Sequence, residues 1–161
     1  MSLFTKKWAI IIKFKKLLYH IAYGKRLEMS DTVTFRNGFH VFIEDTGFVR
    51  IGENTFFNNY CSVNAMNSVI IGENCLFGEN VKIYDHNHKF RDGIKPIAEQ
   101  GFSIGSVTIG DNCWIGTNVV ILKNSCIGEH CVIAAGTVVD GEVPSNTIIY
   151  RDDSKKRMDV K

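Results

Sequence analysis

The chain has 161 residues, of which 45% are hydrophobic, and a formal net charge of +2, as expected for one soluble domain with enough residues to bury a core. A charge balance this close to neutral argues against a nucleic-acid partner. Two prolines and the absence of a low-complexity run leave little room for a long linker.

Residues 1–23 predict a basic amphipathic helix. Apolar residues recur there every three or four positions with lysines between them: Leu3, Phe4, Trp8, Ile11, Phe14, Leu18 and Ile21. The lysines interrupt the apolar run, which is too short to span a membrane and has no small-residue cleavage site. Two roles remain open. The helix caps the open end of the fold built by the rest of the chain, or it attaches the protein to the anionic inner face of a membrane.

A six-residue repeat organises most of the remaining chain, after a strand-like but irregular stretch, 24–50, that predicts a degenerate first turn. From Ile51 a large aliphatic or aromatic residue returns every six positions, usually followed by Gly, with Asn two places later and then a small residue, as in 109–114. Neither the helix period nor the strand period fits this pattern. Three such hexads form a triangular coil of about eighteen residues, and stacked coils place parallel strands roughly 4.8 Å apart. The repeat therefore predicts a parallel β-helix.

The register of the repeat predicts which residues stack. If each coil closes after three hexads, one face shares Ile51, Ile71, Ile109 and Ile127, and the next shares Phe57, Phe77, Ile115 and Ile133. Two extra residues interrupt the register before Ile71. Gly and Asn at the corners tolerate the positive φ of a sharp turn.

The five cysteines are explained by the same repeat. Four occupy the fifth position of a hexad and one the sixth: Cys61, Cys75, Cys113 and Cys131, and then Cys126. Free cysteine behaves as a small buried hydrophobe, and the sequence has no CxxC pair that would suggest zinc or redox chemistry. We therefore expect reduced thiols in a cytoplasmic protein.

The repeat breaks between Ile83 and Ile109, where a long loop, 84–108, leaves the scaffold. The loop begins with Asp85-His86-Asn87-His88, a dense cluster of titratable groups. Long loops on rigid scaffolds commonly carry function, and histidine ordinarily titrates near neutral pH, which suits a general base. The chain ends in a charged tail, 151–161, whose composition is typical of a solvated terminus.

The hexads resemble those of the hexapeptide-repeat acyltransferases, in particular the branch of maltose and galactoside acetyltransferases. The resemblance covers roughly residues 50–150 and implies an all-β, left-handed parallel β-helix, here of about five coils in a domain at 24–150. It also implies acetyl-coenzyme A as the acyl donor, no metal, and a homotrimer with active sites between neighbouring copies.

The resemblance also implies which histidine is the base. In that branch the catalytic histidine lies five residues past the aliphatic residue of its hexad, which corresponds to His88. His86 is the alternative base, although it stands in the hexad position that Asn fills elsewhere and is therefore expected at a corner. Asp85 or the loop would orient the ring.

Other site residues follow from the resemblance one at a time. The acceptor-binding Asn of the family corresponds to Asn58, whereas its acidic residue a little further on is Met66 here, which puts the acceptor's identity in doubt. Trp114, in the family's Trp-Ile-Gly segment, lines the site for acceptor and cofactor, and Thr117 touches the pantetheine arm. An aromatic residue at a trimer interface is the other interpretation of Trp114.

The coenzyme A channel is implied by small residues in the next coil. Ala134 and Ala135 correspond to residues that line this channel, although packing alone explains a pair of alanines equally well. The family's C-terminal Gly-Asn-Pro-Ala-Lys segment is replaced here, and Lys155 and Lys156 are the candidates to hold the coenzyme's phosphates.

The function implied is O-acetylation of a sugar or glycan in capsular polysaccharide, exopolysaccharide or lipopolysaccharide synthesis, with direct transfer to a sugar, nucleotide-sugar or lipid-linked glycan. N-acetylation of an amino sugar nucleotide uses the same fold and base. From other classes, a zinc protein similar to the γ-class carbonic anhydrases would use His86, His88 and His130, and a trimeric scaffold would use no catalytic residue.

Overall fold

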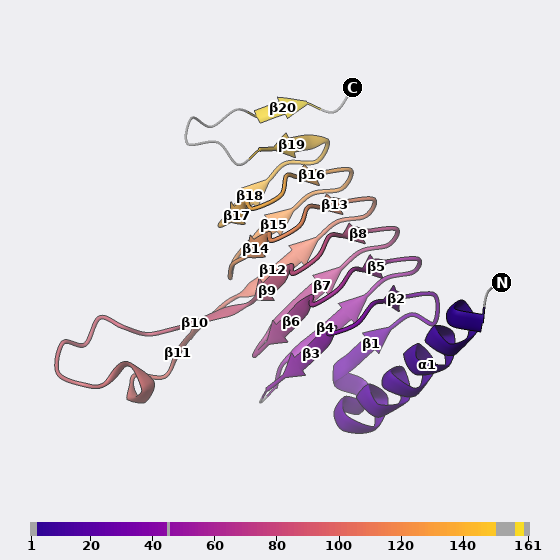
Figure 1. Ribbon diagram of the computed structural model, residues 1–161. Coiled ribbons are helices and arrows are strands. Elements are labelled where there is room, and N and C mark those ends of the chain that lie inside the picture. Colours follow the sequence, from indigo (N-terminus) through magenta and orange to yellow (C-terminus); the bar gives the residue numbers. More distant parts are fainter. Residues whose placement is uncertain (1–2, 45, 151–156, 160–161) are drawn as a thin grey trace.

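A computed structural model describes residues 3–44, 46–150 and 157–159 as a parallel β-solenoid with one N-terminal helix, α1 (Leu3–Tyr23) (Figure 1). Hydrogen-bonded strands form three flat sheets. The first contains β1 (Leu27–Met29), β4 (Phe48–Ile51), β7 (Ser68–Ile71), β12 (Ser106–Ile109), β15 (Cys126–Ile127) and β18 (Glu142–Val143). The second contains β2 (Thr34–Phe35), β5 (Phe56–Phe57), β8 (Leu76–Phe77), β13 (Trp114–Ile115), β16 (Val132–Ile133), β19 (Thr147–Ile149) and β20 (Arg157–Asp159). The third contains β3 (His40–Ile43), β6 (Ser62–Ala65), β9 (Lys82–Tyr84), β14 (Val120–Ile121) and β17 (Val138–Val139).

The coils stack in the register that the hexads predict. Ile51 pairs with Ile71, Ile71 with Ile109 and Ile109 with Ile127, and the second sheet continues the same rule from Phe57 upward. All these pairs are parallel. The irregular stretch 24–50 contributes a first coil, as predicted, and the prediction of about five coils is slightly low because β18 and β19 begin a sixth.

Asparagine turns the corners of the coils. Its backbone takes a positive φ between 54° and 64° at Asn54, Asn74, Asn80, Asn112, Asn118, Asn124 and Asn146. His130 stands in the same hexad position and has a φ of 55°. A short side chain that bonds locally tolerates this left-handed conformation, so the asparagine position of the repeat encodes the turn itself.

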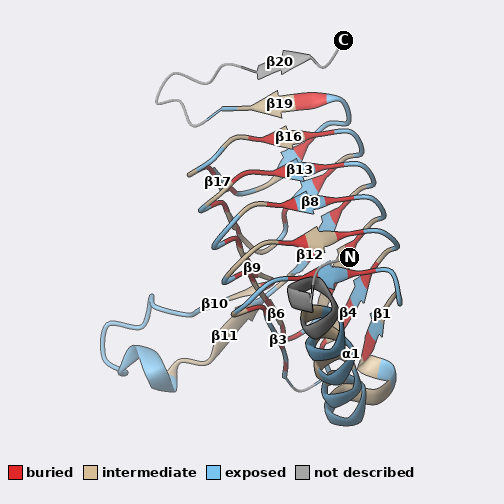
Figure 2. Cartoon of the chain, turned by 45° about the vertical axis from the view of Figure 1, so that its right-hand side comes forward, coloured by how far each residue is buried: buried red, intermediate tan, exposed pale blue. Residues whose placement is uncertain are grey.

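The interior is a continuous column of buried side chains. Figure 2 shows that buried residues recur on the strands of successive coils. Its lower part is aromatic: Phe35, Phe39, Phe57 and Phe77 stack with successive ring centroids 4.7, 4.6 and 4.4 Å apart. Isoleucine fills the column above them. Cys61, Cys75, Cys113 and Cys131 are buried free thiols, as the packing interpretation predicts, whereas Cys126 is exposed and does not fit it.

Helix α1 lies against the first coil and covers its open edge. Trp8 Nε1 donates a hydrogen bond to Phe35 O at 3.0 Å, and the hydroxyls of Tyr19 and Tyr23 donate to Phe39 O at 3.0 Å and Val41 O at 2.9 Å. These carbonyls have no strand below them to satisfy them. Among the described helices, none is long and apolar enough to cross a membrane.

The predicted excursion at 84–108 leaves the stack after β9 and contains a β-hairpin (Figures 1 and 2). Its arms, β10 (His86–His88) and β11 (Phe102–Ile104), are antiparallel, with His86 opposite Ile104 and His88 opposite Phe102. Between them the chain makes a short 3₁₀ helix, Ile97–Glu99. The chain then rejoins the first sheet at β12, so the stack above the hairpin continues in register.

Candidate active site

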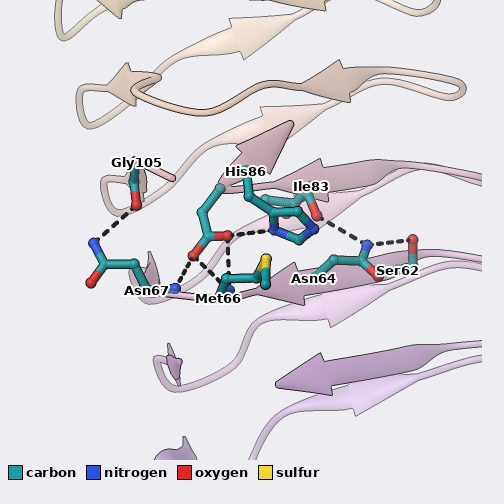
Figure 3. Close-up of polar contacts among 8 residues, drawn as sticks. Ser62, Asn64, Met66, Asn67, Ile83, His86 and Gly105 are labelled. Carbon is teal, nitrogen blue, oxygen red and sulfur yellow. Dashed lines mark hydrogen bonds and ion pairs between the residues drawn. The ribbon is translucent and has the colours of Figure 1, made fainter. Parts of the chain in front are cut away.

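The base of the hairpin is fixed to the coil beneath it by the buried side chain of Asp85. Figure 3 shows Met66, Asn67 and His86, the residues that contact this carboxylate. Its carboxylate accepts hydrogen bonds from Met66 N at 2.9 and 3.1 Å and from Asn67 N at 2.8 Å. Met66 and Asn67 are the two residues that interrupt the hexad register. The backbone N–H groups of these two residues therefore form a socket that binds the carboxylate.

The two arms are also joined to each other at this point. Asp85 O accepts a hydrogen bond from Gly105 N at 2.7 Å, and Gly105 O accepts one from the Asn67 side chain at 2.9 Å. Three segments that are distant in the sequence therefore meet at Asp85, and the start of β10 has a fixed direction.

His86 is held by the same carboxylate. Its Nδ1 lies 2.8 Å from Asp85 Oδ1, and the side chain is only 15% exposed. The corner expected for His86 is wrong: the residue is part of β10, because the chain leaves the coil one residue before the corner would form. Asp85, which the sequence predicts to orient the ring of the base, thus contacts the ring of His86.

His88 lies two residues further along β10 and is exposed. Alternation along a strand puts it on the same side as His86, and both imidazoles pack on Phe102, with ring centroids 4.5 Å apart for His88 and 5.5 Å for His86. Phe102 fixes where the His88 ring lies while leaving it accessible to a ligand.

A cleft of about 490 Å³ opens beside His88. It is lined by the outer part of the hairpin and by one residue of the stack: Asn87, His88, Lys89, Phe90, Arg91, Asp92, Ser103 and Lys123. Three of these side chains are cations and one is an anion, so the cleft favours an anionic ligand. Sequence reasoning missed Lys123, because nothing in its hexad position distinguishes it from a solvated lysine.

Three of the expected cofactor residues and the expected acceptor residue Asn58 gather at another place, the corner between the second and third sheets. Asn58, Thr117, Ala134 and Ala135 all lie in this corner, each in the turn after a strand of the second sheet. The coils are in close contact there: a Cβ placed on Gly116 would approach Ala135 N to 2.5 Å. Thr117 and Ala134 are half-buried and Ala135 is exposed.

Trp114 lies on β13, where its side chain points outward and is 57% exposed. It belongs to an outward apolar ladder in the second sheet, in which cross-strand pairing aligns Phe56, Leu76, Trp114, Val132 and Ile148. His88 extends from the third sheet. One chain therefore places the tryptophan and the histidine on different faces of the solenoid.

The expected phosphate-binding lysines and the histidines of the zinc alternative remain to be placed. Lys155 and Lys156 lie outside the described residues. Within the described part of the chain, no group of three His, Cys, Asp or Glu side chains is arranged to hold a metal ion. His130, the third histidine of the zinc alternative, is a corner residue.

Comparisons with known proteins agree with the repeat. Residues 106–141 match the model of the bacterial transferase hexapeptide (six repeats), and residues 68–83 match the hexapeptide repeat of succinyl-transferase. The "Putative lipopolysaccharide biosynthesis O-acetyl transferase WbbJ" of Escherichia coli (strain K12) is 34% identical over 110 residues, which are 64% of this chain and 56% of WbbJ. The matched region thus spans little more than half of that relative.

Solved structures have the same fold. The hexapeptide-repeat containing acetyltransferase VCA0836 of Vibrio cholerae is 26% identical, with a TM-score of 0.76 over 93% of this chain and 81% of that one. Its complex with acetyl coenzyme A has a TM-score of 0.69 at 23% identity, over 89% and 78% of the two chains. A maltose O-acetyltransferase of Clostridium difficile 630 is 22% identical, with a TM-score of 0.67 over 98% and 88%. The chain therefore carries the hexapeptide repeat and has the fold of the acetyltransferases to which it is similar.

Proposed function

We propose that the protein transfers an acetyl group from acetyl-coenzyme A to a hydroxyl group of a sugar or glycan. The observation that carries this proposal is His88, an exposed imidazole on a hairpin whose base is fixed by Asp85, beside a cleft lined by cations. The repeat and the fold shared with acetyltransferases support the reaction class. The name of the WbbJ relative, a lipopolysaccharide O-acetyl transferase, supports a glycan acceptor.

His88 acts as the general base in this proposal. Its imidazole takes the proton of the acceptor hydroxyl as that oxygen attacks the thioester carbonyl. The carbon–sulfur bond then breaks, coenzyme A leaves as the thiol after taking up a proton, and the acceptor keeps the acetyl group as an ester. No covalent enzyme intermediate is needed. Four of the five cysteines support this direct route, because they are buried in the fifth position of their hexads.

His86 has a different part. Because its Nδ1 is within hydrogen-bond distance of the buried Asp85 carboxylate, this ring joins β10 to the scaffold and keeps Phe102 and His88 in place. The pair resembles a base and its orienting carboxylate, so His86 is also the second candidate for the base. Its lower exposure makes it the less accessible of the two rings for an acceptor hydroxyl.

The cations of the cleft are proposed to hold phosphate. Lys89, Arg91 and Lys123 surround the same space as His88. Both proposed substrate types carry phosphate: coenzyme A on its nucleotide, and a nucleotide-sugar or lipid-linked acceptor on its carrier. Lysine and arginine are the side chains that bind such groups most readily.

We also propose a homotrimer whose active site forms between copies. Trp114 and the His88 hairpin lie on different faces of one chain, so a second copy is needed to bring such residues together. The exposed apolar ladder through Leu76 and Trp114 offers a surface for this contact. Acetyl-coenzyme A and the free thiols support a cytoplasmic location for the trimer.

Leu76→Arg is expected to convert trimers to monomers in sedimentation velocity, because a charge then lies in the apolar ladder. A trimer that survives this change would contradict the interface.

Thiol release from acetyl-coenzyme A tests the reaction. The purified protein would be incubated with sugars, nucleotide-sugars and lipid-linked glycans, and the products identified by mass. We expect release only with an acceptor present and an ester in the product. An amide product would identify an N-acetyltransferase instead. If no thiol is released with any acceptor and calorimetry detects no binding of coenzyme A, the proposal is overturned in favour of a trimeric scaffold.

A further inference from the structure

Helix α1 uses one side to cap the solenoid. Trp8, Tyr19 and Tyr23 donate hydrogen bonds to the first coil, and Lys16 Nζ donates to Ser30 O at 3.0 Å and Asp31 O at 2.8 Å. Ile12 completes this side by packing against the core. At about 100° per residue these five positions fall within one quadrant of the helix. These five residues hold the inward face of α1 against the first coil.

Between Ile10 and Ile21 the opposite side of α1 is apolar as well. Ile10, Phe14 and Ile21 are 68, 60 and 71% exposed, and Leu17 and Leu18 beside them are also exposed. Their centre lies about 180° around the helix from the cap residues. An ordinary surface helix would place polar residues there. The outward face therefore fits an apolar environment that the single chain does not supply.

The charges on α1 limit what that environment is. The helix sequence contains no Asp or Glu. By the same rotation Lys13 borders one side of the outward apolar face and Lys15 the other. Lys16 is already engaged with the first coil. A helix with an apolar face between lysines, and without acidic residues, has the charge pattern that binds anionic lipid headgroups.

We propose that the outward face of α1 docks the protein on an anionic lipid bilayer, with the helix axis in the plane of the membrane. Ile10, Phe14, Leu17, Leu18 and Ile21 enter the boundary between headgroups and acyl chains, and Lys13 and Lys15 contact phosphates. A second copy of the chain fits this face less well, because a symmetric contact would bring the lysine borders of two helices together. The docking does not depend on acyl transfer.

Vesicle sedimentation tests the docking with the full chain. We expect the full chain to bind vesicles of phosphatidylcholine mixed with phosphatidylglycerol and to bind vesicles of phosphatidylcholine alone weakly. It should dissociate from the anionic vesicles as the salt concentration rises. Phe14→Ser/Ile21→Ser should weaken binding at least about tenfold, because two apolar side chains no longer enter the bilayer. Lys13→Glu/Lys15→Glu should weaken binding to the anionic vesicles by about tenfold or more.

A matched control has equally exposed apolar residues elsewhere. Val138→Ser/Ile94→Ser changes two side chains that are 61 and 95% exposed and far from α1 in sequence, and should bind vesicles as the unmodified protein does. Equal binding by Phe14→Ser/Ile21→Ser would overturn the proposal. A changed sedimentation coefficient of Phe14→Ser/Ile21→Ser in the absence of vesicles would also overturn the proposal, because the outward face would then join copies of the chain.

Discussion

The coils and the hairpin use the same residue type in different ways. In the coils His130 turns a corner with a φ of 55°, in a position that asparagine fills elsewhere, and its imidazole is not part of the cleft. In the hairpin His86 and His88 are strand residues that pack on one aromatic ring. A histidine in the repeat thus acts through its backbone, whereas a histidine in the hairpin acts through its ring.

Glycine in the coils should be the most sensitive position. In Gly116→Ala the new Cβ would meet Ala135 N at 2.5 Å, so adjacent coils must separate, and we expect a loss of about 2–3 kcal/mol in the free energy of unfolding. Gly93→Ala, in the hairpin, has open space around its Cβ and should unfold as the unmodified protein does. Urea denaturation measures both. Equal stability of the two variants would remove the distinction between stack and hairpin.

Asp85 is the joint between the two regions. In Asp85→Asn an amide NH₂ group replaces one acceptor oxygen in front of the Met66 and Asn67 N–H groups, which should cost about 1–3 kcal/mol. The hairpin base should loosen, so hydrogen exchange at His86–His88 should rise and turnover fall. Glu99→Gln changes an exposed carboxylate of the same hairpin that does not line the cleft, and serves as the control. If exchange at β10 stays unchanged in Asp85→Asn, Asp85 does not anchor the hairpin.

Tyr19 gives the capped end of the stack a pH dependence. Burial raises the pKa of Tyr19 above its ordinary value of 10.0. The folded state therefore favours the neutral phenol, and this stabilisation is complete below about pH 10 and disappears as pH rises through the folded-state pKa. Tyr19→Phe should lose about 1 kcal/mol at neutral pH. Between neutral and strongly alkaline pH, the melting temperature of Tyr19→Phe should fall less than that of the unmodified protein. An equal fall in the two proteins would contradict the contribution of Tyr19 to the pH dependence.

The smallest effect is expected at His130. Asparagine adopts the same positive φ in the other corners, so His130→Asn should change the free energy of unfolding by less than about 0.5 kcal/mol. Thermal unfolding measures this change. A large loss would mean that the imidazole itself supports the coil.

The sequence predicted the coils well because each hexad position has one physical requirement. Ile109 and Ile127 stack because both are the aliphatic residue of their hexads, and Asn112 turns a corner because its position requires positive φ. The same rule failed at His86, since the count of six does not tell where the chain leaves the stack. The socket at Met66 and Asn67 was visible only as two extra residues. Lys123 gave no signal, because only the folded chain brings it beside the hairpin.

The most direct test of the account compares His88→Gln with His130→Asn in acetyl-coenzyme A-dependent thiol release, using an acceptor that the unmodified protein accepts. We expect His88→Gln to keep its melting temperature and to lose at least about a hundredfold in rate, as removal of a general base does. His130→Asn should keep both. Unchanged turnover in His88→Gln would contradict the assignment, and if His86→Gln alone lost the rate, the base would be His86.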